Sequence, residues 1–261
     1  MSDVEVTNEA GVCWIALNRP ESKNGLTDAV NASIIEALDG AAADKAIRCV
    51  VITGKNGNFC SGLDLKAMAA GAMGGMDNVE EHMRKYFHGM IRAVRRVEKP
   101  VVALVDGAAV GYGCDLALAC DLRIGTERTR FGEVFVKRGL MPDGGGTWSL
   151  PRLVGVGKAL ELMFTGDLVG ADESHRLGLV TRVIPSAESE QQTWELAKRL
   201  AAGPPLVHAW IKRAVYAAQA TDLDAALENE VRGQMQLLRS KDFFEGIAAF
   251  FQKRDPKFTG E

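Results

Sequence analysis

The chain has 261 residues, of which 47% are hydrophobic and 25% are charged, and these proportions are typical of a globular protein with a substantial core. Its net charge of −3 gives no general attraction to nucleic acid or to an acidic membrane, so we expect neither as a partner. The apolar runs are too short to cross a bilayer and the polar start "MSDVEVTNEAG" does not look like a signal peptide, which together predict a cytoplasmic protein.

The first part of the chain alternates predicted strands and helices. Residues 4–6 and 12–17 form a predicted hairpin, and Thr27 is placed to cap a helix that runs to about residue 43. Residues 47–54 are continuously apolar, which is typical of a strand covered on both faces of its sheet. This alternation predicts the α/β class.

Two glycine-containing turns each connect a predicted strand to a helix. The loop 55–68 passes through Gly62, and the stretch 106–121, "DGAAVGYGCDLALACD", follows an apolar strand at 101–105 and becomes helical near Gly111. Such turns leave free backbone N–H groups at the positive end of the helix dipole. Most of them are purely structural, but two that converge on one oxygen form an oxyanion hole. The second turn has neither the ending of a P-loop nor the spacing of a dinucleotide fingerprint.

Between these turns lies a long predicted helix with a basic face. The segment 69–75 is small and flexible in composition, and Asp77 with Glu80 then resembles a capping box at the start of a helix that ends at Pro100. A basic face is usually just solvated, and the alternatives are a phosphate-bearing ligand or RNA. The basic residues are Lys85, His88, Arg92, Arg96 and Lys99.

The second half of the chain contains one more unusual turn and then becomes helical. After a predicted strand at 121–125, Asp143 stands between a proline and three glycines, where it either bonds its own backbone or presents a fixed carboxylate. Another strand is expected near 179–184. The helices expected beyond Asp143 are 158–164, 172–177, 194–201, 206–220, 223–238 and 242–252. Because the last of them are too few to bury themselves, we expect them to pack on the core or on a neighbouring subunit.

Scattered cysteines and histidines indicate no metal site. The histidines and cysteines lack the spacing of metal ligands, and the number of cysteines is odd. We therefore expect buried or free thiols and no bound metal. The five cysteines are Cys13, Cys49, Cys60, Cys114 and Cys120.

Taken together, five motifs resemble the crotonase superfamily, the enoyl-CoA hydratase/isomerase family, and the likeness to phenylacetate-pathway isomerases is especially close. They are "LNRPESKNGL", "FCSGLDL", "DGAAVGYGCDLALACDLRI", "GLMPDGGGTWSLPRLVG" and "EGIAAFFQKRDPKFTG". The resemblance implies a spiral of β-β-α turns over residues 1–200 and a helical C-terminal region over 201–261. It also implies an acyl-CoA substrate, a homotrimer or dimer of trimers, and no cofactor apart from the coenzyme A that belongs to the substrate.

The resemblance also assigns binding residues. The two oxyanion-hole N–H groups fall on Leu63 and Tyr112, although the family usually has a small residue at the second position. Lys23 and Leu26 match the stretch that lies against CoA, and Lys253 matches a basic residue that reaches a CoA phosphate from a neighbouring helix or subunit.

The acid and base residues separate the reactions of this family. Its hydratases carry glutamates where this chain has Asp115 and Phe135, so the second glutamate is missing. Asp143 instead matches the aspartate of members that are double-bond isomerases, ring-opening isomerases or dehalogenases. We therefore expect Asp143 to carry a proton in enoyl-CoA isomerisation, and Asp115 either to share that task or to cap its helix. Phe135 and Trp148 are expected to shape the acyl pocket, whereas Glu133 matches a non-catalytic position.

Two other functions stay open. One is hydration of an enoyl-CoA by Asp115 and Asp143 in place of the two glutamates. The other is a non-catalytic protein of the same fold that binds RNA through the basic helix, although the acidic net charge argues against it.

Overall fold

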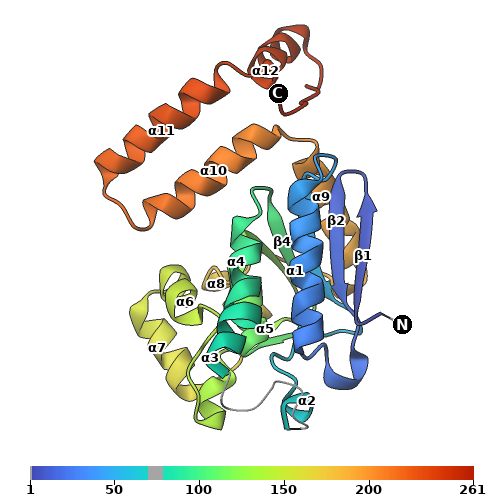
Figure 1. The fold of residues 1–261 in the computed structure, drawn as a ribbon, viewed down its shortest axis with the longest axis vertical. Helices are drawn as coiled ribbons and strands as arrows, with labels where there is room; N and C mark the ends of the chain where they lie inside the picture. The colour runs from blue at the N-terminus through green and yellow to red at the C-terminus, as the bar shows by residue number, and fades with distance from the viewer. Residues whose placement is uncertain (1, 70–78) are drawn as a thin grey trace.

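The computed structural model describes residues 2–69 and 79–261. Its main sheet has six strands in the order β1-β2-β3-β4-β6-β9 (Figure 1). The first two strands pair antiparallel, as the predicted hairpin requires, and every later neighbour is parallel. The strands are β1 (Val4–Glu9), β2 (Val12–Leu17), β3 (Cys49–Gly54), β4 (Val101–Val105), β6 (Leu122–Thr126) and β9 (Arg182–Ile184).

Helices cover both faces of this sheet, which explains the continuous apolar strands. On one face lie α1 (Asp28–Ala43), α4 (His88–Arg96) and α5 (Tyr112–Ala119), and on the other lies α9 (Ser189–Ala201). Thr27 caps α1 as predicted, because its side chain accepts a hydrogen bond from the Val30 N–H at 3.4 Å. On the opposite face Trp14 of β2 stacks on Trp194 of α9, with ring centroids 4.8 Å apart.

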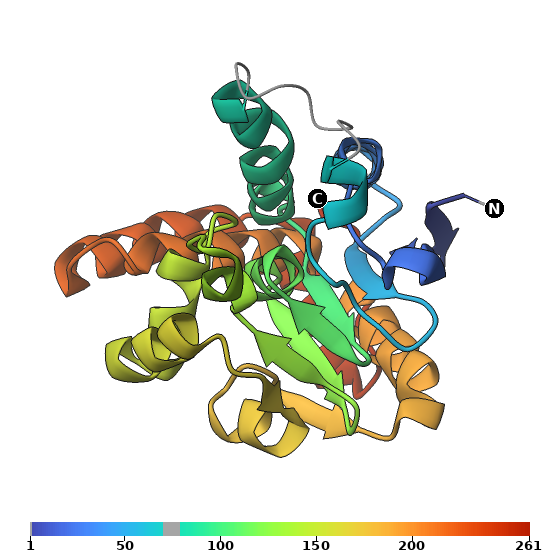
Figure 2. The ribbon, with the colours of Figure 1, turned by 90° about the horizontal axis from the view of Figure 1, so that it is seen from below.

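A second sheet of very short strands was not predicted. It consists of β5 (Ala108–Val110), β7 (Arg130–Gly132) and β8 (Val169–Gly170), with β5 parallel to β7 and β7 antiparallel to β8. Figure 2 shows the green strands of this part of the chain at the centre of the molecule, with helices around them. The second sheet therefore carries the chain from the end of β4 to the start of α5.

The predicted basic helix consists of three joined segments. These are α3 (Val79–His82), a π-helical turn (Met83–Phe87) and α4. Asp77, the predicted capping residue, and all of the expected flexible segment 69–75 except Ala69 lie outside the described residues. The π-helical turn widens the helix at Phe87, where it packs against the start of α5.

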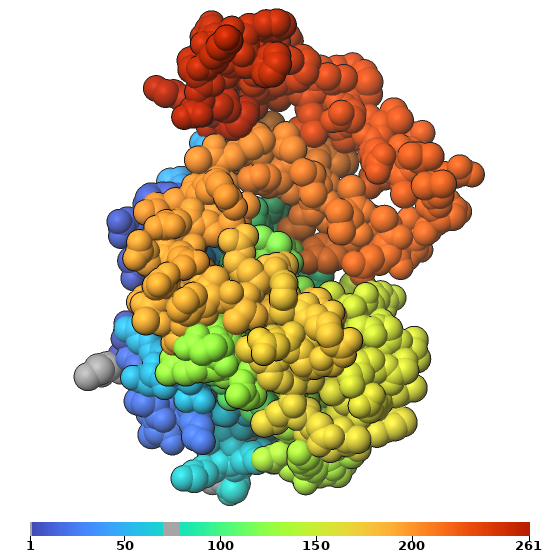
Figure 3. All heavy atoms as spheres, turned by 180° about the vertical axis from the view of Figure 1, so that it is seen from behind, coloured from blue at the N-terminus to red at the C-terminus, as the bar shows by residue number. Residues whose placement is uncertain are grey.

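The last three helices form an arm that extends from the core (Figures 1 and 3). They are α10 (Pro205–Ala218), α11 (Leu223–Leu237) and α12 (Lys241–Gln252). The arm is tied to the core at Asp121, which pairs with Lys212 at 2.8 Å and accepts a hydrogen bond from the Tyr216 hydroxyl at 2.7 Å. Several large apolar side chains on the arm are exposed, and Phe250 and Phe251 are each 77% accessible.

The other helices are short. They are α2 (Leu65–Ala69), α6 (Gly146–Val154), α7 (Val156–Thr165) and α8 (Ala171–Arg176), with 3-10 turns at Pro20–Ser22, Val134–Arg138 and Ser186–Glu188. Within the described residues, no helix has both the length and the apolar character needed to cross a membrane.

Candidate active site

The two glycine turns lie side by side. Cys60 forms a β-bridge with Ala109: its N–H donates to the Ala108 carbonyl at 2.9 Å, and its carbonyl accepts from the Val110 N–H at 3.1 Å. A Cβ atom at Gly62, where φ is +83°, would lie 2.8 Å from the Val110 carbonyl oxygen. Glycine is therefore needed for the close approach of the two turns.

Two free N–H groups meet at this junction. Tyr112 begins α5, and a Cβ at Gly62 would lie 3.2 Å from its amide nitrogen. Within the described parts of the chain, the amides of Leu63 and Tyr112 donate no hydrogen bond. Both residues line the same cavity. Two free donors beside one cavity are the arrangement that binds a developing oxyanion.

The Tyr112 side chain is buried away from solvent. Its hydroxyl donates to the Phe87 carbonyl in the π-helical turn, and its ring meets the Phe87 ring edge-on with centroids 5.0 Å apart. Burial, with smaller contributions from nearby acidic groups, raises the pKa of Tyr112 well above its usual value, so the hydroxyl remains a donor. A large residue is tolerated at this position because its ring packs in the core.

Leu26 holds the first turn in place. Its N–H donates to the Gly62 carbonyl at 2.8 Å and it forms a β-bridge with Leu63. Its side chain is completely buried, and its backbone positions the Leu63 amide. That Leu26 lies in the stretch against CoA stays a prediction. Lys23 is exposed beside it, with its carbonyl accepting from the Ser61 N–H at 3.1 Å.

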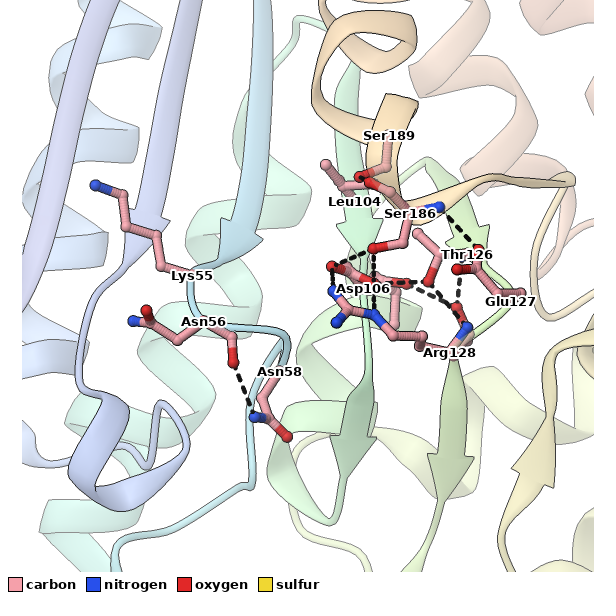
Figure 4. A network of polar contacts seen from close by, with 12 residues as sticks. Lys55, Asn56, Asn58, Leu104, Asp106, Thr126, Glu127, Arg128, Ser186 and Ser189 are labelled. Atoms are coloured by element: carbon pink, nitrogen blue, oxygen red, sulfur yellow. Dashed lines mark hydrogen bonds and ion pairs between the residues drawn. The ribbon is translucent and has the colours of Figure 1, made fainter.

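A polar network fixes the second turn where β4 ends (Figure 4). Asp106 accepts hydrogen bonds from Thr126 Oγ1 at 2.7 Å, from Arg128 Nε at 2.9 Å and from Ser186 Oγ at 3.1 Å. These donors follow β6 and β9, so Asp106 ties three strand ends together. The next residue, Gly107, packs so closely on the 55–58 loop that a Cβ there would overlap the Gly57 carbonyl oxygen.

The cavity beside the two free amides has a volume of about 110 Å³ and mostly apolar walls. Among its described lining residues, Asp143 is the one carboxylate, and Phe135 lies on the wall as expected. Burial raises the pKa of Asp143, and nearby His88 partly opposes that rise. The lining residues include Ser61, Gly62, Leu63, Leu65, Phe87, Val110, Gly111, Tyr112, Val134, Phe135, Arg138, Leu140 and Asp143.

Asp115 lies beneath this cavity and is not among the lining residues. It is 1% exposed, and its Oδ2 accepts a hydrogen bond from the Gly144 N–H at 2.8 Å. The alternative that Asp115 caps its own helix is wrong, since α5 has no side-chain cap and begins at Gly111. Asp115 instead binds the turn that carries Asp143.

Glu133, which matches a non-catalytic position of the family, has a buried acidic neighbour that the sequence does not indicate. It is 1% exposed, and a Cβ atom at Gly146 would overlap Asp115 Oδ1 and lie 2.7 Å from Glu133 Oε1, so the two carboxyl groups are neighbours. Burial raises the pKa of Glu133 to about 7 and that of Asp115 well above its usual value, the latter also because Glu133 is close. In the sequence, Glu133 is a glutamate directly after a buried strand, and this position does not indicate that Asp115 is its neighbour.

Trp148 and Lys253 do not lie at this cavity. Trp148, expected in the acyl pocket, lies between Arg95 and Arg152, at 5.2 and 4.2 Å from ring centroid to guanidinium carbon. It lines a separate cavity of about 420 Å³ against α10. Lys253 is exposed at the end of α12, and this helix lies at the opposite end of the molecule from α2 (Figure 1).

The basic face of the helix before Pro100 is partly paired with α1. Arg96 pairs with Asp39 at 2.5 Å, and Lys99 Nζ donates to the Asp44 carbonyl at 2.7 Å. These contacts give part of the face a structural explanation. Within the described residues, no group of histidine, cysteine and acidic side chains has the arrangement of a metal site.

Paired amides beside a half-buried carboxylate define the class of enzymes that stabilise an oxyanion while a proton is moved. The sequence model of the enoyl-CoA hydratase/isomerase family matches residues 7–261, so the chain belongs to this family.

Individual relatives and solved structures agree with this assignment. The chain is 39% identical to a probable enoyl-CoA hydratase of Rhodobacter capsulatus, covering 96% of this chain and 95% of that protein. It is 35% identical to the 1,2-epoxyphenylacetyl-CoA isomerase of Escherichia coli, with 97% of each covered. The crystal structure of an enoyl-CoA hydratase from Bacillus anthracis superposes with a TM-score of 0.95 at 32% identity over 100% of both chains. The predicted crotonase-like α/β fold with a helical C-terminal region is thus confirmed.

Proposed function

We propose that this protein is an enoyl-CoA isomerase in which Asp143 carries the proton. One observation supports this most strongly: Asp143 is the one carboxylate among the described residues that line the cavity of the two free amides. Phe135 occupies the position where hydratases of the family have a second glutamate, and it lies on the same wall. One carboxylate suffices to take a proton from one carbon and return it to another.

The proposed reaction begins with the acyl-CoA thioester carbonyl against the amides of Leu63 and Tyr112. As a proton leaves the carbon activated by that carbonyl, negative charge grows on the oxygen and both hydrogen bonds strengthen. Asp143 accepts the proton, the double bond moves into conjugation, and Asp143 returns the proton to a more distant carbon. One amide donor of this kind contributes roughly 3 to 4 kcal/mol to lowering the barrier.

The apolar cavity makes Asp143 suited to this task. Burial raises its pKa, so the ionised carboxylate binds a proton more strongly than an exposed aspartate does. A base whose pKa is closer to neutral also releases the proton again, as isomerisation requires.

The C-terminal arm supports an assembled form, a homotrimer or a dimer of trimers. Its exposed aromatic residues, Phe250 and Phe251 among them, need a covering surface, and Lys253 lies exposed at the end of α12 beside them. We propose that Lys253 meets the CoA of a neighbouring subunit, while Lys23 contacts CoA from its own. Light scattering during gel filtration tests the assembly: a monomer at micromolar concentration would contradict it.

The isomerase proposal is tested with 3-hexenoyl-CoA. We expect the product to be the conjugated 2-enoyl-CoA, detected by its absorbance and by mass spectrometry at unchanged mass. Failure to convert any 3-enoyl-CoA of short or medium chain would contradict the proposal.

Hydration by Asp115 and Asp143 is the second candidate, because relatives named as hydratases are among the similar proteins and Asp115 contacts the turn of Asp143. The burial of Asp115 below the cavity weighs against it. Loss of enoyl absorbance from crotonyl-CoA, with a gain of one water in mass, would favour this candidate.

A further inference from the structure

Two buried carboxyl groups lie under the turn that carries Asp143. Asp115 comes from α5 and Glu133 from the residue after β7, and Gly146 lies against both. Asp115 Oδ1 and both oxygens of Glu133 receive no hydrogen bond from an N–H or hydroxyl donor in the described part of the chain. Asp115 Oδ2, in contrast, accepts from the Gly144 amide.

Two such groups cannot both be ionised in this environment. Carboxylates need donors or cations when they are removed from water, and two negative charges at contact distance repel each other strongly. A single proton between them satisfies one oxygen of each group, because the protonated carboxyl donates to the ionised one. The raised pKa of each group agrees with a retained proton.

We propose that Glu133 is a positioning residue: it shares one proton with Asp115, and the pair holds the Gly144 amide and thereby fixes the Asp143 carboxylate beside the two free amides. Neither Asp115 nor Glu133 touches the substrate in this arrangement. This role rests on the proposed function, because the pair acts by holding Asp143, the proposed base, in position.

The surroundings of the pair contain acidic or neutral titratable groups. Cys114 of α5 lies close to Glu133, Asp143 faces the pair from the turn above, and Tyr112 lies one turn before Asp115. None of these groups supplies a positive charge. The shared proton is therefore the device that neutralises one of the two carboxylates.

Two variants of Glu133 and one control test this proposal. Glu133→Gln retains a donor to Asp115 but has no proton to lose, so kcat near neutral pH should stay within roughly three-fold of wild type. Glu133→Ala removes the donor and leaves Asp115 ionised and unpaired, so kcat should fall about ten-fold or more while KM for the acyl-CoA stays nearly constant. The matched control is Glu190→Gln, an exposed glutamate in α9.

The pH profile distinguishes positioning from simple structural support. In wild type, kcat should decline on the alkaline side as the pair loses its proton and the turn is pushed open. Glu133→Gln should lack this decline, whereas Glu190→Gln should keep it. An unchanged alkaline limb in Glu133→Gln, or full kcat in Glu133→Ala, would overturn the proposal.

Infrared spectroscopy tests the proton itself without any substrate. The resting wild-type protein at neutral pH should show a protonated-carboxyl band that persists in Asp143→Asn and is lost in Glu133→Gln. If turnover is absent with all acyl-CoA substrates but the band behaves in this way, the isomerase assignment fails and the shared proton stands. Absence of the band from wild type would overturn the shared proton whatever the activity.

Discussion

Replacement of Asp143 by asparagine removes the proton carrier and little else. The amide has nearly the shape of the carboxylate, and the Gly144 N–H that bonds Asp115 belongs to the backbone, so the turn remains in place. The two free amides and the cavity wall are also unchanged. A positioned general base contributes about 10²- to 10⁴-fold to the rate, and we expect Asp143→Asn to lose at least that much, corresponding to about 3 to 5 kcal/mol of barrier.

The assay follows conversion of 3-hexenoyl-CoA, with binding of the conjugated product measured separately by calorimetry. Turnover should fall while the dissociation constant changes by less than about three-fold, because the variant keeps every donor to the thioester. The matched control, Asp172→Asn on the exposed start of α8, should behave as wild type. A general base contributes about 10²-fold or more, so a kcat of Asp143→Asn within about ten-fold of wild type would refute the role of Asp143.

Three further predictions follow from the supporting residues. Gly62→Ala should separate the two turns and lower kcat by about 10²- to 10³-fold in steady-state assays, the effect of losing one oxyanion donor; unchanged kcat would contradict that geometry. Tyr112→Phe should keep kcat within a few-fold but reduce the free energy of unfolding in urea by about 0.5 to 1.5 kcal/mol, because it removes the buried hydrogen bond to the Phe87 carbonyl; equal stability would count against the bond. Because the folded-state pKa of Glu133 is raised from 4.5 to about 7, the free energy of unfolding should fall as pH rises between these values, by about 1.4 kcal/mol per pH unit for one retained proton. Glu133→Gln should remove that slope, and an identical slope would contradict the retained proton.

The strands and helices with strong local signals were predictable from the sequence. The continuous apolar strand before Gly54, the Thr27 cap and the helices after Pro205 were predicted within a few residues, since each depends on local pattern. The small sheet was missed because strands of two or three residues have no pattern of their own. They exist because the glycine turns bring distant segments together.

The part of the candidate site that could be predicted from the sequence is the backbone N–H groups, because they depend on short local turns. Glycine turns at strand ends indicated free backbone N–H groups, and the family resemblance assigned them to Leu63 and Tyr112. Both residues line one cavity in the structure. The neighbourhood of Glu133 and Asp115 and the contacts of Trp148 with Arg95 and Arg152 both depend on how segments distant in the sequence pack together. Neither can be obtained from the residues on either side in the sequence.

The most direct test of the account is mass spectrometry of the products in water labelled with heavy oxygen. Purified protein is incubated with 3-hexenoyl-CoA and, separately, with crotonyl-CoA. We predict that 3-hexenoyl-CoA becomes its conjugated isomer without gain of labelled oxygen and that crotonyl-CoA stays unhydrated. A labelled hydroxyl group on either acyl chain would contradict isomerisation by Asp143 and would favour hydration.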